Sequence, residues 1–224
     1  SSASPHTVDA STVKALRPAT SDTASLLRNV PGVSLYGAGG LSSLPSIRGL
    51  ADDRIRIKVD GMDLIAACPN HMNPALSYLD PSNVGRLAVF AGVTPVSVGG
   101  DSIAGTIVAE TPPPRFARPG EGSLLAGEIG AYYRSNGNAF GGNLAATYAT
   151  ESFSITYTGA TAESDNLRAG RDFKTSAVTG RPGHALPLDE IGSSAYESRN
   201  HELGIAFTGG GHLVEAKVGY QDIP

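Results

Sequence analysis

The sequence predicts an α+β unit, with a small mixed sheet and short helices, followed by a series of long antiparallel β-strands. Short strand-like segments separated by glycine and proline turns occupy the chain up to residue 110. Beyond residue 120, five segments of about 10–13 residues alternate polar and apolar side chains. The 28 Gly and 15 Pro among 224 residues exclude a long helical bundle, because both residue types are unfavourable inside helices.

The first unit is expected to contain short helices, one of them ending at Tyr78, and several short strands. Ser21 or Asp22 can cap a helix that runs to residue 28, and Pro31 with Gly32 ends it. Segment 54–59 alternates polar and apolar residues, as a half-buried strand does. A mixed sheet of four short strands is therefore predicted from this segment and from 46–49, 86–91 and 106–110, and segment 33–36 is β-rich as well.

A proline-rich segment divides the two units. Residues 111–120 contain four prolines, which favour an extended run and cannot continue a sheet ladder. The balance of charges changes here as well, from 10 basic and 9 acidic residues before position 119 to 7 and 12 after it. We therefore expect one domain over residues 1–118 and a second over residues 119–224.

The second unit is predicted to consist of five strands, at 123–134, 138–150, 152–163, 199–208 and 212–222. In segment 153–158, Phe153, Ile155 and Tyr157 share one face, and the hydroxyl residues between them share the other. The turns at Glu151 and 209–211 fall on one side, and the turn at 135–137 and the long loop 164–198 on the other. These features are typical of strands that cross a bilayer, although a soluble β-meander or sandwich fits the same pattern.

Charge and cysteine usage exclude two other classes. The net charge of −4 provides no basic surface for nucleic acid. Cys68 is the only cysteine, so an internal disulfide is impossible. As a nucleophile, Cys68 would have His71 as its base only three positions away, whereas such pairs usually come from distant segments. No third orienting group is evident, and we do not expect an enzyme.

The pentapeptide Cys68-Pro-Asn-His-Met72 contains the chemistry that is most specific in the chain. A thiolate and a thioether are soft ligands that together select soft ions, Cu(I) foremost, and His71 between them would suit copper or zinc. The competing interpretation is that Cys68 is a small buried apolar residue and Met72 fills a gap in a core. The other methionine, Met62, is expected to be a packing residue.

Six segments of the first unit carry a family resemblance. In chain order they read SLLRNVPGV (25–33), SIRGL (46–50), VDGM (59–62), DPSNV (80–84), VFAG (89–92) and GGDSIAGTIV (99–108). In this order they resemble the plug domain of TonB-dependent outer-membrane receptors. The resemblance implies a plug inside the lumen of a barrel of roughly 22 strands, of which this chain would supply the first five. We therefore expect an incomplete barrel, located in the outer membrane.

The resemblance also implies partners and a transport role. Receptors of this family are driven by the TonB protein and are surrounded by outer-membrane lipid. The TonB-contacting box that normally precedes the plug is not evident in residues 1–7. Because a plug must move, its interface with the wall should be polar, and five charged residues are candidates for it: Arg48, Arg54, Arg56, Asp60 and Arg86.

The pentapeptide and its continuation resemble the copper branch of the family. In that branch, a Cys-x-x-x-Met motif of the plug binds copper, which implies metal ligands at Cys68 and Met72; His71 is added on chemical grounds alone. The predicted function is active uptake of a metal, most simply copper, bound at the plug apex. Copper would then be the transported ligand, and no cofactor is expected. Uptake of a ferric siderophore or another organic ligand is the alternative, as is a soluble β-rich protein without a transport role.

Overall fold

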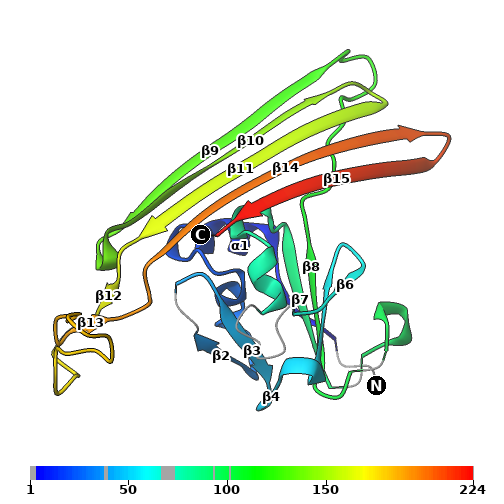
Figure 1. The fold of residues 1–224 in the computed structure, drawn as a ribbon. Helices are drawn as coiled ribbons and strands as arrows, with labels where there is room; N and C mark the ends of the chain where they lie inside the picture. The colour runs from blue at the N-terminus through cyan, green and yellow to red at the C-terminus, as the bar shows by residue number, and fades with distance from the viewer. Residues whose placement is uncertain (1–3, 38–39, 67–73, 93, 101, 224) are drawn as a thin grey trace.

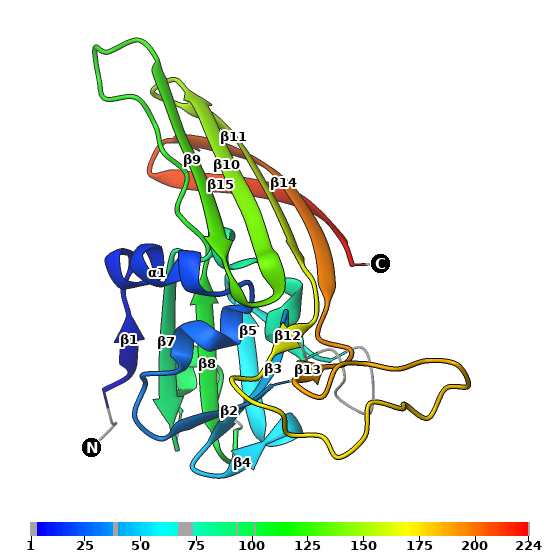
Figure 2. The same ribbon diagram turned by 90° about the vertical axis from the view of Figure 1, so that its left-hand side faces the viewer.

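The computed structural model describes residues 4–37, 40–66, 74–92, 94–100 and 102–223. Figure 1 shows two parts: a compact α+β unit up to Glu110, called the plug below, and a curved sheet of five long strands that lies over it, called the wall. The view turned by 90° in Figure 2 shows the wall rising above one side of the plug. The predicted fold class is confirmed.

The plug contains two small sheets rather than the one predicted. The first is mixed and has the order β1-β7-β8-β5-β6, with β5 and β8 parallel and the other pairs antiparallel. The second has the order β2-β3-β4. The bounds are β1 His6–Val8, β2 Val33–Gly37, β3 Ser43–Ile47, β4 Leu50–Ala51, β5 Ile55–Val59, β6 Met62–Leu64, β7 Arg86–Ala91 and β8 Gly105–Glu110.

The helical elements of the plug are short, and most are 3-10 turns. The helix predicted to run to residue 28 is η2, Thr23–Leu27, and Asp22 caps it by accepting a hydrogen bond from the Ala24 amide at 3.1 Å. The α-helix α1, Ala10–Leu16, was not predicted; Asp9 caps it through the Thr12 amide at 2.8 Å. The other turns are η1 Arg17–Ala19, η3 Asp52–Arg54, η4 Ala75–Tyr78, η5 Pro81–Asn83 and η6 Val96–Val98.

The hydrophobic core lies entirely within the plug. Its fully buried side chains come from η2, β3, η4, β7 and β8, and include Leu26, Leu27, Ile47, Leu76, Leu87 and Ile107. Gly105 begins β8 with φ of +146°, and a Cβ there would lie 2.2 Å from the carbonyl oxygen of Phe90. Only glycine fits this close approach of β7 to β8.

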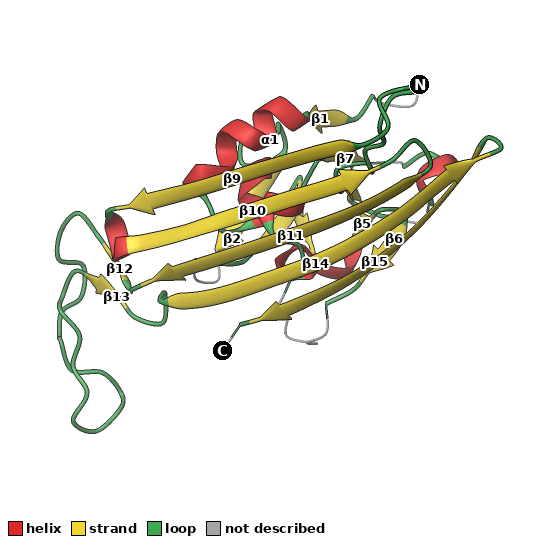
Figure 3. Ribbon diagram, turned by 90° about the horizontal axis from the view of Figure 1, so that it is seen from above, coloured by secondary structure: helices red, strands yellow, loops and turns green. Residues whose placement is uncertain are grey.

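The wall is one antiparallel sheet in which neighbouring strands follow one another in the chain. Its strands are β9 Leu124–Arg134, β10 Ala139–Ala149, β11 Phe153–Ser164, β14 Tyr196–Gly209 and β15 His212–Asp222, and Figure 3 shows them side by side. The predicted arrangement of turns is confirmed, with the turns after β10 and β14 at one end. At the other end, the 3-10 turn η7 Asn136–Asn138 follows β9, and the long loop follows β11. That loop contains a small hairpin, β12 Leu167–Arg168 with β13 Glu190–Ile191.

The two faces of the wall differ in polarity. The face away from the plug presents large apolar side chains to the outside; Leu125 is 83% and Ile129 is 84% exposed, and Leu144, Phe207 and Val218 are also exposed. The face toward the plug carries small and hydroxyl residues, such as the buried Ser154 and Thr147. A sheet with one exposed apolar face and one polar face is the arrangement of strands that separate lipid from a barrel lumen.

Residues 111–123 connect the plug to the wall. Thr111 donates its amide to Asp60 Oδ1 at 2.9 Å, and the Ala117 amide donates to the Thr150 carbonyl at 3.0 Å. The connection is therefore attached to the plug at one end and to the wall at the other. The domain boundary proposed between residues 118 and 119 falls within it. Within the described residues, no helix has the length and apolar character needed to cross a membrane.

Candidate functional site

The three predicted metal ligands, Cys68, His71 and Met72, lie outside the described residues. The described chain on either side of them is well anchored. The preceding segment forms β6, which pairs with β5 at the edge of the mixed sheet. After the motif, Pro74 precedes η4, in which Ala75 and Leu76 are buried in the plug core. Two fixed elements therefore hold the ends of the segment that carries the motif.

Met62 does not pack in the core as predicted. It lies in β6 and is 65% exposed. Elsewhere in the described chain, no group of three or more His, Cys, Asp or Glu side chains is arranged to hold a metal ion.

The site that the structure does describe is the interface between plug and wall. One part of it surrounds Ser21, which is buried just before η2. The Ser21 hydroxyl lies 2.7 Å from the Tyr132 hydroxyl, and it accepts from Arg134 at 2.7 Å and from Tyr196 at 3.0 Å. Arg134 also donates to the Ala19 carbonyl at 3.0 Å, and its guanidinium lies 4.5 Å above the Tyr132 ring. Side chains from β9 and β14 thus bind one short segment of the plug.

A second group of contacts joins α1 and η1 to β9. Glu128 of β9 forms ion pairs with Lys14 at 3.1 Å and with Arg17 at 3.5 Å. Arg17 also donates to the Val84 carbonyl at 2.7 Å. Burial lowers the pKa of Arg17, against the opposite effect of the Glu128 and Asp80 carboxylates. Because arginine starts from a very high pKa, it stays charged, and Arg17 is a fixed positive charge between the plug and the wall.

A third group of contacts joins the segment after the predicted metal-binding motif to β14 and β15. Asn200 donates to Asp80 at 3.0 Å, and Asn83 donates to Glu202 at 2.7 Å. Gln221 of β15 donates to the Ser77 carbonyl at 3.0 Å. Burial raises the pKa of Asp80, although Ser82 and Arg17 favour its charged form.

Of the five charged residues expected at the wall, the structure places Asp60 there. Lys217 of β15 lies 3.1 Å from the Asp60 carboxylate. Burial raises the pKa of Asp60, but hydrogen bonds from Thr111 and Lys217 outweigh it, so the pKa lies below its ordinary value. Arg56 pairs with Asp63 at 2.5 Å and Arg86 with Glu110 at 3.3 Å, both within the plug. The polar interface was predicted correctly, but most of its residues were not.

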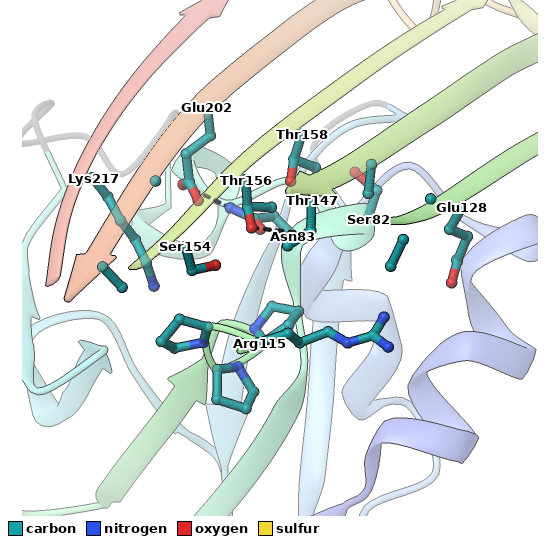
Figure 4. A pocket seen from close by; sticks show the side chains of 18 of the residues that line it. Ser82, Asn83, Arg115, Glu128, Thr147, Ser154, Thr156, Thr158, Glu202 and Lys217 are labelled. Atoms are coloured by element: carbon teal, nitrogen blue, oxygen red, sulfur yellow. Dashed lines mark hydrogen bonds between the residues drawn. The ribbon is translucent and has the colours of Figure 1, made fainter. Parts of the chain in front are cut away.

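A polar cavity of about 240 Å³ lies between these groups of contacts (Figure 4). Hydroxyl side chains of β10 and β11 line its wall side, and prolines of the connection line the other. Its charged residues are Arg17, Arg115, Glu128, Glu202, Glu215 and Lys217. Among the described residues around it there is no sulfur atom and no imidazole. The cavity therefore suits water and hydrated ions rather than tight binding of a soft metal.

Strand alternation was the signal that could have found the wall side of this interface. Glu128, Tyr132 and Arg134 recur at every second or fourth position of β9 and therefore lie on one face. No comparable sequence pattern marks their partners on the plug. Ser21 and Arg17 lie in or beside short turns, more than 100 positions from β9 in the chain.

Comparisons with known proteins agree with this architecture. Residues 1–106 match the family model described as the TonB-dependent receptor plug domain. Among solved structures, the copper transporter OprC is 26% identical with a TM-score of 0.74, over 99% of this chain and 30% of that one. The FrpB iron transporter of Neisseria meningitidis (F3-3 variant) is 19% identical with a TM-score of 0.75, over 98% and 31%. The alcaligin outer-membrane receptor FauA of Bordetella pertussis is 14% identical with a TM-score of 0.68, over 100% and 32%.

Residues 1–106 therefore form a plug domain of the TonB-dependent receptor type, and the fold of the whole chain is like that of the plug and opening strands of such receptors. The chain spans about 30% of the length of the copper transporter that it matches, so its five strands form part of a barrel wall. A comparison with curated protein sequences gives no match.

Proposed function

We propose that this chain belongs to a receptor that takes up copper, and that Cys68 and Met72 bind the ion at the plug apex. The observation that carries the proposal is the Cys-x-x-x-Met spacing, because thiolate and thioether together favour Cu(I) over harder ions. Similarity to a copper transporter at 26% identity supports the same ligand. His71, between the two sulfur residues, is proposed as a third and weaker ligand.

The described neighbours of the motif suit a binding segment that must also release its ion. The edge strand β6 precedes the motif, and beyond it η4 and η5 carry hydrogen bonds to β14 and β15. A displacement of the plug relative to the wall would therefore act directly on the residues that follow the motif. We propose that TonB supplies the energy for this displacement. The chain binds and passes its ligand and performs no catalytic step.

The proposal is tested by the copper content of the complete receptor, purified in reducing buffer and loaded with Cu(I). Cys68→Ser and Met72→Ala should each reduce bound copper from about one ion per receptor to a small fraction, because two soft ligands are needed for tight binding. His71→Ala should weaken binding less. Met62→Ala is the matched control, since it removes the chain's other methionine from an exposed position, and it should leave the copper content unchanged.

Unchanged copper in both the Cys68 and Met72 variants would contradict the proposal. If a ferric siderophore were the ligand, siderophore binding should survive both substitutions and the wild-type receptor should hold no stoichiometric copper.

A further inference from the structure

Arg17 contacts two separate parts of the molecule. It follows α1 and begins η1, and its side chain is only 19% exposed. One terminal nitrogen donates to the Val84 carbonyl at 2.7 Å, and the other pairs with Glu128 of the wall at 3.5 Å. The planar guanidinium allows both contacts at once, which a lysine ammonium on a single flexible stem cannot reproduce.

The segment that Arg17 holds is itself attached to the wall. Val84 is fully buried, and the turn before it, η5, is capped by Asp80 and ends with Asn83, both of which bind β14. Arg17 thus lies between two sets of wall contacts, those of residues 14–21 with β9 and β14 and those of residues 80–83 with β14. These two plug segments are more than 60 positions apart in the chain.

We infer that Arg17 is a positioning residue that makes segments 14–22 and 80–84 bind and leave the wall as one unit. With the bridge in place, a displacement of α1 and η1 acts on residues 80–84 through the Val84 carbonyl. Without the Arg17 bridge, each of the two segments contacts the wall independently of the other. Where this matters for uptake, the inference rests on the proposed function, because residues 80–84 lie a few positions after the proposed copper ligands.

The test measures amide hydrogen exchange in the complete, ligand-free receptor. Arg17→Gln should speed exchange of the Asn83 and Val84 amides, which close the turn η5, on the order of fivefold. Lys14→Gln is the matched control, because it removes the same charge and the same Glu128 partner but no contact with Val84. It should leave exchange in residues 80–84 unchanged. Equal effects of the two variants, or no effect of Arg17→Gln, would overturn the inference.

A second variant covers the case in which Arg17→Gln does not assemble. Arg17→Lys keeps the positive charge but cannot hold Glu128 and the Val84 carbonyl together, so exchange in residues 80–84 should still rise. Wild-type exchange in an assembled Arg17→Lys receptor would overturn the inference.

Transport provides an independent measurement. Arg17→Gln should leave the equilibrium constant for Cu(I) binding within about twofold and reduce the uptake rate on the order of fivefold. Lys14→Gln should alter neither. A wild-type receptor that binds no copper would reject the proposed function and leave the exchange result standing, so the two failures are distinguishable. Equal uptake by both variants in a receptor that does bind copper would contradict the coupling role.

Discussion

The plug is held against the wall by single polar side chains rather than by an apolar interface. The hydroxyl of Ser21 contacts Tyr132, Arg134 and Tyr196 within 3.0 Å, which uses all of its hydrogen-bonding capacity. The carboxylate of Glu128 similarly serves two cations. Such contacts are strong only while they are complete, because a buried polar group left without a partner is costly. A polar interface of this kind is consistent with a plug that must be able to move.

Asp80 gives this interface a defined dependence on pH. Its pKa is raised in the folded protein by burial. Between the ordinary aspartate pKa of about 3.9 and the raised value, the folded state therefore binds more protons than the unfolded state. The contribution of Asp80 to stability then falls as pH rises through this window.

Replacing Asp80 with asparagine should remove this dependence. In Asp80→Asn, the urea midpoint of plug unfolding should gain on that of the wild type as pH increases from about 4, and the gain should level off above the raised pKa. Asp9→Asn is an exposed control with the opposite sign, because hydrogen bonds from Thr12 and Ser11 lower the pKa of Asp9. If the urea midpoint of the wild-type plug instead rose relative to that of the Asp80→Asn plug as pH increases, the raised pKa of Asp80 would be contradicted.

At the scale of residues, the sequence predicted which side chains share a face of a strand, but not which residues they contact across the interface. The alternation in β11 correctly grouped Ser154 and Thr156 on one face, and the structure shows that this face meets the plug. The partner of Lys217, Asp60, was among the residues expected at the wall, but nothing in the sequence paired the two. Such pairs depend on tertiary packing between segments far apart in the chain. The roles of Cys68, His71 and Met72 stay predictions.

At the scale of elements, strong local periodicity made the wall strands easy to predict. The predicted segment 212–222 coincides with β15. The predicted bounds of β9, β10 and β11 differ from those in the structure by no more than one residue at either end. The missed helix and strands of the plug, α1, β1, β4 and β6, have between two and seven residues. Elements that short show less than two helical turns or two strand repeats, so tertiary contacts decide them.

The alternation in the wall leads to a prediction about one outward position. Ile129 is exposed on the apolar face of β9, opposite Leu144 of β10. Ile129→Arg should cost about 2–4 kcal/mol for a charge near the bilayer midplane and reduce the fraction of receptor that folds into lipid vesicles. Thr158→Lys is the control, because Thr158 lines the polar cavity; it should assemble normally. Equal assembly of both variants would mean that Ile129 does not face lipid.

At the scale of the whole molecule, the two parts are stabilised differently. The plug has a conventional core, in which buried side chains from both of its sheets and its 3-10 turns meet. The wall has no core of its own among the described residues, and its buried side chains are small ones such as Ala149 and Ala206. An open sheet with unpaired edges at β9 and β15 requires further strands, lipid on one face and the plug on the other.

The organisation into a plug and a wall was predictable from the sequence, whereas the division of the plug into two sheets was not. Segments 33–36 and 46–49 have the strand signals of the mixed sheet, yet they form β2 and β3 of a separate sheet. Strand propensity indicates that a segment forms a β-strand, but it does not indicate which other strand it pairs with. For the contact between the plug and the wall, the sequence likewise predicted only that the interface is polar.

The most direct test of the account is the environment of successive positions along β11 in the complete receptor in lipid bilayers. Single cysteines at 155, 156, 157 and 158, introduced in a Cys68→Ser background, would carry a spin label. Collisions with oxygen, which concentrates in lipid, should be frequent at positions 155 and 157 and rare at 156 and 158, since alternate side chains face opposite sides of the sheet. Equal access of a water-soluble nickel chelate to all four positions would contradict a wall with lipid on one face and the plug on the other.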